Sequence, residues 1–206
     1  LTATITFSEA VTLNTSAGSP TLALLIGSAT VLATYVSGSG SNTLIFSTTI
    51  ASGQNDSDGV AIASNALSLN GATLKDAAGN NATVFAIAIA PNAQFLVDTT
   101  SPTLTISSIL SNLKIGETAA INFTFSEDPG SSFSWNGTTG DVDVLGGTLG
   151  ALSGTELTRT AIFKPTANLA SDTASITVAA NTYLDAAGNY GGAGTTPLIS
   201  IDTLAP

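Results

Sequence analysis

The stretch VDTTSP at residues 97–102 recurs at the end of the chain as IDTLAP, residues 201–206. Both copies read apolar residue, Asp, Thr, any residue, small residue, Pro, and their aspartates, Asp98 and Asp202, stand 104 residues apart. This spacing suits one β-sandwich domain of about 100 residues. Proline cannot donate to a strand ladder, and it disfavours helix in the residue before it. Each copy is therefore interpreted as an extended joint between domains.

The repeat predicts two domains in series. The expected ranges are 1–97 for the first domain, 98–201 for the second, and 202–206 for the start of a linker to a following repeat. The same alternation of apolar and polar residues opens both domains, as LTATITF at 1–7 and AAINFTF at 119–125. Because side chains alternate across a strand, both runs predict a half-buried β-strand.

Further short β-rich runs follow, separated by Gly- and Ser-rich turns, and no helical period is visible. The expected strands are Thr21–Ile26, Thr30–Val36, Asn42–Ile50, Val60–Leu69, Thr83–Val97, Thr103–Ile109, Asp141–Leu145, Glu156–Lys164 and Ala174–Ala180. We therefore predict an all-β fold of two antiparallel β-sandwiches. We expect the first domain to lack its N-terminal strand here, because the sequence opens on the run that matches 119–125 and not on one that matches 103–109. A shortened chain and a strand donated by a neighbour both explain this.

Two more motifs recur in the same order in each domain. Phe-Ser-Glu ends the opening strand at Glu9 and again at Glu127. Asp-Ala-Ala-Gly-Asn precedes the last strand, beginning at Asp76 and again at Asp185. Together with the joint motif, these sequences resemble the bacterial Ig-like repeats of large surface adhesins. The resemblance implies tandem Ig-like sandwiches, extracellular display at the cell surface and, in many members, calcium at the domain joints.

Composition excludes several classes of function. The chain has 14 acidic and 4 basic residues, a net charge of −10, whereas nucleic acids and anionic membrane surfaces require clustered Lys and Arg. No uninterrupted apolar run reaches the roughly 18 residues of a membrane-spanning helix. With no His and no Cys, nucleophile systems based on these residues are impossible, so we predict that the chain is not an enzyme.

Strand parity predicts where the acidic motif residues gather. Successive strands of an antiparallel sandwich run in opposite directions, so the loops between them alternate between the two ends of the domain. The first strand starts just after Asp98, and the second and sixth strands end near Glu127 and Asp185. All three residues are therefore expected at the same end of the second domain. The acidic loop of the first domain, with Asp56 and Asp58, is expected to face the same joint. Such a group of carboxylates suits Ca²⁺, which takes six to eight oxygen ligands. Glu9, Asp76 and Asp202 occupy the equivalent motif positions at the other joints and are also predicted to bind metal.

Each of these residues also has a simpler interpretation. The aspartates of the two Asp-Ala-Ala-Gly-Asn motifs can make Asx turns, with Gly supplying a positive φ. Glu9 and Glu127 can be solvated strand ends. The remaining acidic residues Asp128, Asp141, Asp143 and Glu156 are expected to be surface charges.

The function predicted from the sequence is an extracellular spacer module of a bacterial surface adhesin, stiffened by Ca²⁺ at its joints. Its partners would be the neighbouring Ig-like repeats of the same chain. The alternative is a building block of a self-assembling surface filament or layer, in which copies of the chain bind one another. Binding of ice or carbohydrate through rows of Thr, such as Thr2, Thr4 and Thr6, has less support, since alternating Thr is ordinary on the solvated face of a strand.

Overall fold

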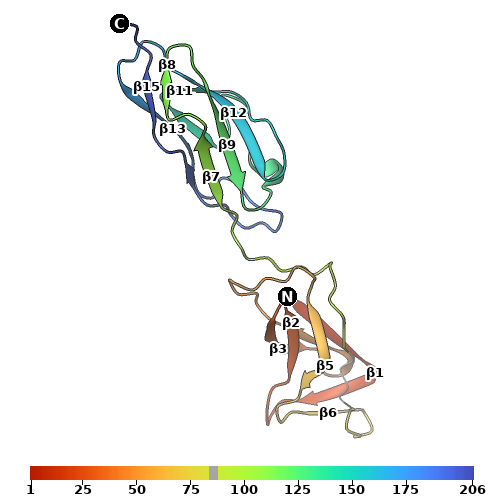
Figure 1. Cartoon of the computed structure of the whole chain (residues 1–206). Coiled ribbons are helices and arrows are strands. Elements are labelled where there is room, and N and C mark those ends of the chain that lie inside the picture. Colours follow the sequence, from red (N-terminus) through yellow and green to blue (C-terminus); the bar gives the residue numbers. More distant parts are fainter. Residues whose placement is uncertain (84–87) are drawn as a thin grey trace. The chain divides into compact units, whose positions relative to one another are not determined.

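The computed structural model describes residues 1–83 and 88–206 and divides into two compact units, Leu1–Thr99 and Thr100–Pro206 (Figure 1). The described residues are almost entirely strand and loop, and their one helical element is a short 3₁₀ turn at Gly130–Ser132. The predicted all-β class is confirmed. Among the described residues, no helix has the length and apolar character that crossing a membrane requires.

The strands are short and joined by turns, as the sequence pattern predicts. Those of the first unit are β1 (Thr2–Asn14), β2 (Thr21–Ile26), β3 (Ala29–Ser37), β4 (Ser41–Ser47), β5 (Ala61–Ser68) and β6 (Thr73–Lys75). Those of the second unit are β7 (Leu104–Ser108), β8 (Asn112–Lys114), β9 (Ala119–Phe125), β10 (Val142–Leu145), β11 (Gly147–Leu149), β12 (Thr158–Pro165), β13 (Asp172–Val178), β14 (Gly194–Thr195) and β15 (Ile199–Asp202).

The strands of the first unit form one continuous antiparallel sheet in the order β5-β2-β3-β4-β1-β6. Leu24 of β2, Phe46 of β4 and Leu74 of β6, each at most 2% exposed, belong to a single core cluster. Since these strands are not all neighbours in the sheet, the sheet must bend over its own apolar face. The core of the first unit is therefore enclosed by strands from distant positions of one sheet.

The second unit is a sandwich of two sheets, one ordered β11-β12-β9-β7 and the other β10-β13-β15-β8, with β14 added beside β13. Its core includes Phe123 and Phe163 from one sheet and Ile176 from the other, all fully buried. The first strand is divided between the sheets: β7 pairs antiparallel with β9, and β8 pairs parallel with β15. This strand links both layers of the sandwich.

Two expected elements differ from the structure. β1 does not end at Glu9 but continues to Asn14, because Thr12–Asn14 pair with β6 after an irregularity that follows Thr6. The expected run Thr83–Val97 includes residues 84–87, which lie outside the described part of the chain. Two of its described residues form isolated bridges: Ile89 pairs with Ile62, and Val97 pairs with Asp56.

The opening strands of the two units, β1 and β9, correspond to each other and share one kind of neighbour. The alternating run of both β1 and β9 ends in Phe-Ser-Glu, and superimposing this motif aligns Ile5 with Phe123. On one side, β1 pairs with β4 and β9 pairs with β12. On its other side β9 carries β7. Within the described residues of the first unit, no strand occupies that position beside the first half of β1. The core side chains of that half are accordingly only half-buried.

We expect the two opening strands to differ in how much their isoleucines stabilise the fold. Ile121→Ala in β9 removes a side chain with no exposure and should lower the free energy of unfolding of the second unit by about 2–5 kcal/mol. Ile5→Ala in β1 removes a half-buried side chain and should cost about 1 kcal/mol.

Urea unfolding followed by far-UV circular dichroism measures both losses. Fluorescence of the single Trp assigns the second transition, because Trp135 packs against the core of the second unit. Equal losses for the two variants would contradict the difference in burial between β1 and β9.

Candidate functional site

The threonine of each joint motif fastens the joint to the domain that precedes it. Thr99 Oγ1 donates to the carbonyl of Gln54 at 3.1 Å and accepts the N–H of Gly53 at 2.9 Å. In the second copy, Thr203 Oγ1 donates to the carbonyl of Thr166 at 2.7 Å and accepts the N–H of Leu169 at 3.0 Å. The same pair of hydrogen bonds at both joints explains why Thr follows Asp in both copies.

The proline end of the first joint is fastened to the second unit. The carbonyl of Pro102 accepts the N–H of Gly192 at 3.0 Å and the hydroxyl of Tyr183 at 3.4 Å. Thr103 then exchanges hydrogen bonds with Ser126, the serine of the Phe-Ser-Glu motif. Anchors on both sides therefore restrict the joint to a very short segment around residues 100 and 101.

Both Asp-Ala-Ala-Gly-Asn motifs form the same Asx turn. The carboxylate of Asp185 accepts the backbone N–H groups of Ala187 and Asn189 and the side-chain amide of Asn189. Asp76 is held by the backbone and side-chain N–H groups of Asn80. Burial of Asp185, which is 9% exposed, acts to raise its pKa, but these donors outweigh burial and the pKa is lowered. The turn keeps this carboxylate charged and fixed in place.

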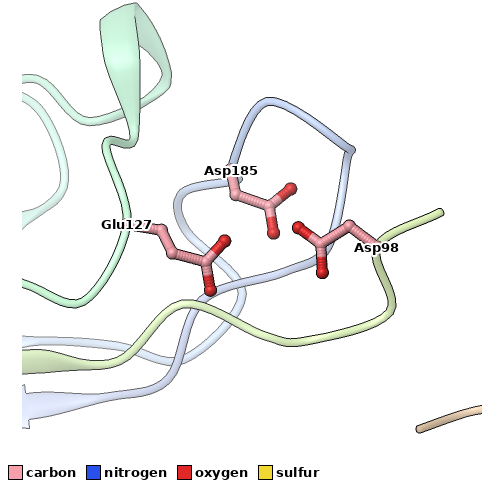
Figure 2. A group of neighbouring side chains, drawn as sticks. All are labelled: Asp98, Glu127 and Asp185. Carbon is pink, nitrogen blue, oxygen red and sulfur yellow. The ribbon is translucent and has the colours of Figure 1, made fainter. Parts of the chain in front are cut away.

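Asp185 lies in a group of three carboxylates with Asp98 and Glu127 (Figure 2). One oxygen of each lies within 4.8 Å of the others, and Figure 2 shows the three carboxylates pointing toward one another. Asp98 precedes β7, Glu127 follows β9, and Asp185 sits in the Asx turn, so three separate segments supply the group. The alternating direction of successive strands predicted this convergence from the sequence.

Three negative charges this close repel one another, and a cation placed among them would remove that repulsion. The ligand atoms are carboxylate oxygens, which hard cations such as Ca²⁺ prefer. Asp98 is exposed, Glu127 is half-buried and Asp185 is nearly buried, so the group is open to solvent on the side of Asp98. Water molecules could therefore complete the coordination of an ion.

The other predicted ligands do not belong to such a group among the described residues. Glu9 is exposed on the continued strand β1, and Asp58 and Asp202 are exposed as well. Asp76 holds its Asx turn. Their predicted role in binding metal stays a prediction.

Asp56 has a structural role that sequence reasoning missed. Its carboxylate is 4% exposed and accepts the N–H groups of Gly27 at 2.8 Å, Gly59 at 2.7 Å and Asp58 at 3.3 Å. The Gly27 amide lowers the pKa most, burial opposes it, and the amides of Gly59 and Asp58 lower it further. Asp56 therefore holds together segments of the first unit that are distant in the sequence.

Asp56 in the first unit and Asp172 in the second have equivalent backbone pairing partners. Asp56 bridges Val97, the residue before the first joint aspartate, and Asp172 pairs with Ile201, the residue before the second. Asp172 is exposed and accepts the N–H of Thr173. The two repeats thus use the same position differently, which no local sequence pattern indicates.

Asp128 is not a simple surface charge. It pairs at 3.2 Å with Arg159, which is 7% exposed and also donates to the carbonyl of Glu156. The amide of Gly130 donates to Asp128 and, together with Arg159, lowers its pKa. Asp128 neutralises a buried cation, and its replacement would disturb the fold beside Glu127.

A comparison with protein families matches residues 98–201 to the bacterial Ig-like domain. The match covers just over half of the chain and begins at Asp98. The chain belongs to the bacterial Ig-like domain family. Ig-like domains of this family often occur in bacterial surface proteins and are typically not enzymes. A search of curated proteins finds no match to the chain.

The first Ig-like domain should lose stability in acid through Asp56. Its carboxylate has a folded pKa below the ordinary 3.8, so its contribution is present above about pH 4 and is lost as the pH falls through the folded value. Asp56→Asn should lower the free energy of unfolding by about 2 kcal/mol at pH 7, because buried backbone donors lose a charged acceptor.

Urea unfolding of the variant and the parent at pH 7 and pH 3 tests this, with the exposed Glu9→Gln as a control in the same domain. The difference between Asp56→Asn and the parent should shrink at pH 3. An unchanged difference would show that the charge of Asp56 is not the stabilising feature.

Proposed function

We propose that the chain is a spacer module of a bacterial surface adhesin, in which Ca²⁺ bound by Asp98, Glu127 and Asp185 stiffens the joint. The convergence of these three carboxylates, one of them in the joint motif itself, is the observation that carries the proposal. Family membership supports a role at the cell surface. The module would hold an adhesive region away from the cell and would carry out no reaction.

Calcium is favoured over magnesium by the character of the group. Mg²⁺ requires nearly ideal octahedral geometry and gives up its water reluctantly, whereas Ca²⁺ accepts more ligands in irregular arrangements. Here the ligands come from a joint, a strand end and an Asx turn, three segments of irregular backbone that are far apart in the sequence. A set of this kind suits the larger and more adaptable cation.

Stiffening would follow from where Asp98 stands in the chain. Its neighbour Thr99 is hydrogen-bonded to residues 53 and 54 of the first Ig-like domain. Glu127 and Asp185 belong to the second Ig-like domain. An ion held by all three carboxylates would therefore tie the joint segment to the second domain, directly beside its attachment to the first. Bending at the joint would then require the ion to leave.

We expect Ca²⁺ to stabilise and straighten the chain. Extracellular calcium modules bind with Kd on the order of 10⁻⁴–10⁻³ M, and at ten times Kd one site adds about 1.4 kcal/mol to the free energy of unfolding. Calorimetry should show a higher melting temperature with calcium than with chelator, and small-angle scattering should show a larger maximum dimension.

Asp98→Asn should remove both effects, since it deletes one ligand charge. The matched control is Asp143→Asn, which changes an exposed aspartate on β10 and should keep the full response to calcium. If the maximum dimension and the melting temperature of the parent do not change when calcium is removed, the calcium proposal is wrong.

A further inference from the structure

A groove of about 670 Å³ lies on the surface of the second Ig-like domain, over the strands β13, β15 and β8. These three strands are neighbours in one sheet (Figure 1). All the residues that line the groove belong to the second Ig-like domain. Sites for small ligands typically have volumes of about 300–1,000 Å³, so the groove has the size of such a site.

Three small polar side chains that line the groove stand in one row across the sheet. Thr173 of β13 pairs with Ser200 of β15, and Ser200 pairs with Asn112 of β8. Because neighbouring strands lie about 4.8 Å apart, the three side chains are regularly spaced. Within the described part of the chain, the hydroxyls of Thr173 and Ser200 make no hydrogen bond. Each hydroxyl can both donate and accept, so the row offers several hydrogen bonds to a ligand.

Two exposed leucines border this polar row on the same face of the sheet. Leu198 stands two residues before Ser200. Leu145 of β10 lies opposite Ser175, which is two residues from Thr173 on β13. Residues two apart on a strand share a face, so both leucines lie beside the row. They are 68% and 63% exposed. The surface is therefore apolar along one border of the groove and rich in hydrogen-bonding groups within it.

The charged residues of the groove are mostly acidic. Glu117, Asp172 and Asp202 line it together with one cation, Lys114, whose ammonium lies 3.8 Å from the carboxylate of Glu117. These carboxylates do not form a metal-binding group among the described residues. An anionic ligand would be repelled by them, whereas a neutral ligand would find further hydrogen-bond acceptors.

The first Ig-like domain does not offer the same acceptor at the equivalent position. Asp56, which corresponds to Asp172 in its backbone pairing, is buried and accepts three backbone N–H groups. Asp172 is exposed and accepts only the N–H of Thr173, at 2.7 Å. The different use of this position in the two repeats therefore makes a carboxylate available in the second domain alone.

We propose that this groove binds a neutral oligosaccharide. A sugar ring carries hydroxyls along its edges and C–H groups on its faces, which matches a hydroxyl row bordered by leucines. The side chains of Thr173, Ser200 and Asn112 bind the sugar hydroxyls, and the carboxylates of the groove exclude acidic sugars. The site is independent of calcium. Glu117 precedes β9 and Glu127 follows it, so the groove and the carboxylate group lie at opposite ends of a strand about 20 Å long.

The test titrates the whole 206-residue chain with three neutral trisaccharides, maltotriose, cellotriose and triacetylchitotriose, and follows the backbone amides by NMR. At least one trisaccharide should cause saturable chemical-shift changes that include the amides of Asn112, Thr173 and Ser200. The affinity should be the same with calcium and with chelator. Sialyllactose, an acidic trisaccharide, should bind at least about tenfold more weakly, because the carboxylates of the groove repel it.

Variants make the result specific to the groove. Thr173→Val combined with Ser200→Ala removes two hydroxyls from exposed strand positions, so the circular dichroism spectrum should not change and the affinity should fall at least about tenfold. The matched control, Thr105→Val, changes an exposed threonine of β7 in the other sheet and should keep the full affinity. Asp172→Asn should reduce the difference in affinity between the neutral trisaccharide and sialyllactose.

No saturable change with any of the three trisaccharides, or equal affinity of the double variant and the parent, would overturn the proposal. Equal affinity for sialyllactose and the neutral trisaccharide would overturn the role given to the carboxylates. None of these results bears on the calcium proposal, which depends on the melting temperature and the scattering with and without calcium.

Discussion

Backbone pairing of the first strand with both sheets is the interaction on which the second Ig-like domain depends. β7 completes one sheet by pairing with β9, and β8 completes the other by pairing with β15. One short stretch of chain thereby covers the core from the side where the two sheets meet. Leu104, Ile106 and Leu113 on this stretch are nearly fully buried. The strand supplies hydrogen bonds and apolar cover at the same time.

The strands of the first unit are arranged differently from those of the second. The sheet of the first unit bends into one continuous layer around a smaller core, and the segment equivalent to the last strand forms only isolated bridges where it is described. Large apolar side chains remain exposed beside β1.

The first joint combines neutral hydrogen bonds with a carboxylate that lies close to two others. Thr99 and Thr203 fasten each joint to the preceding domain through paired hydrogen bonds that do not depend on salt or metal. One carboxylate oxygen of Asp98 lies within 4.8 Å of an oxygen of Glu127 and one of Asp185, and salt screens interactions between exposed charges of this kind.

The sequence by itself determined the all-β class, the positions of most strands and the convergence of Asp98, Glu127 and Asp185. These follow from local patterns, since a period of two residues defines a strand and the count of strands decides which end of the sandwich a loop occupies. Repetition of three motifs indicated the bacterial Ig-like family, which the family comparison confirmed.

Only the tertiary structure decided the roles of Asp56, Thr99 and Asp128. The donors to Asp56 include Gly27, 29 residues away, and the partner of Asp128 is Arg159, 31 residues away. No local pattern specifies which distant backbone amide or cation a carboxylate will meet, because that depends on how the sheet bends and how the loops close. The continuation of β1 past Glu9 has the same cause, since pairing with β6 extends the strand where its own sequence gives no signal.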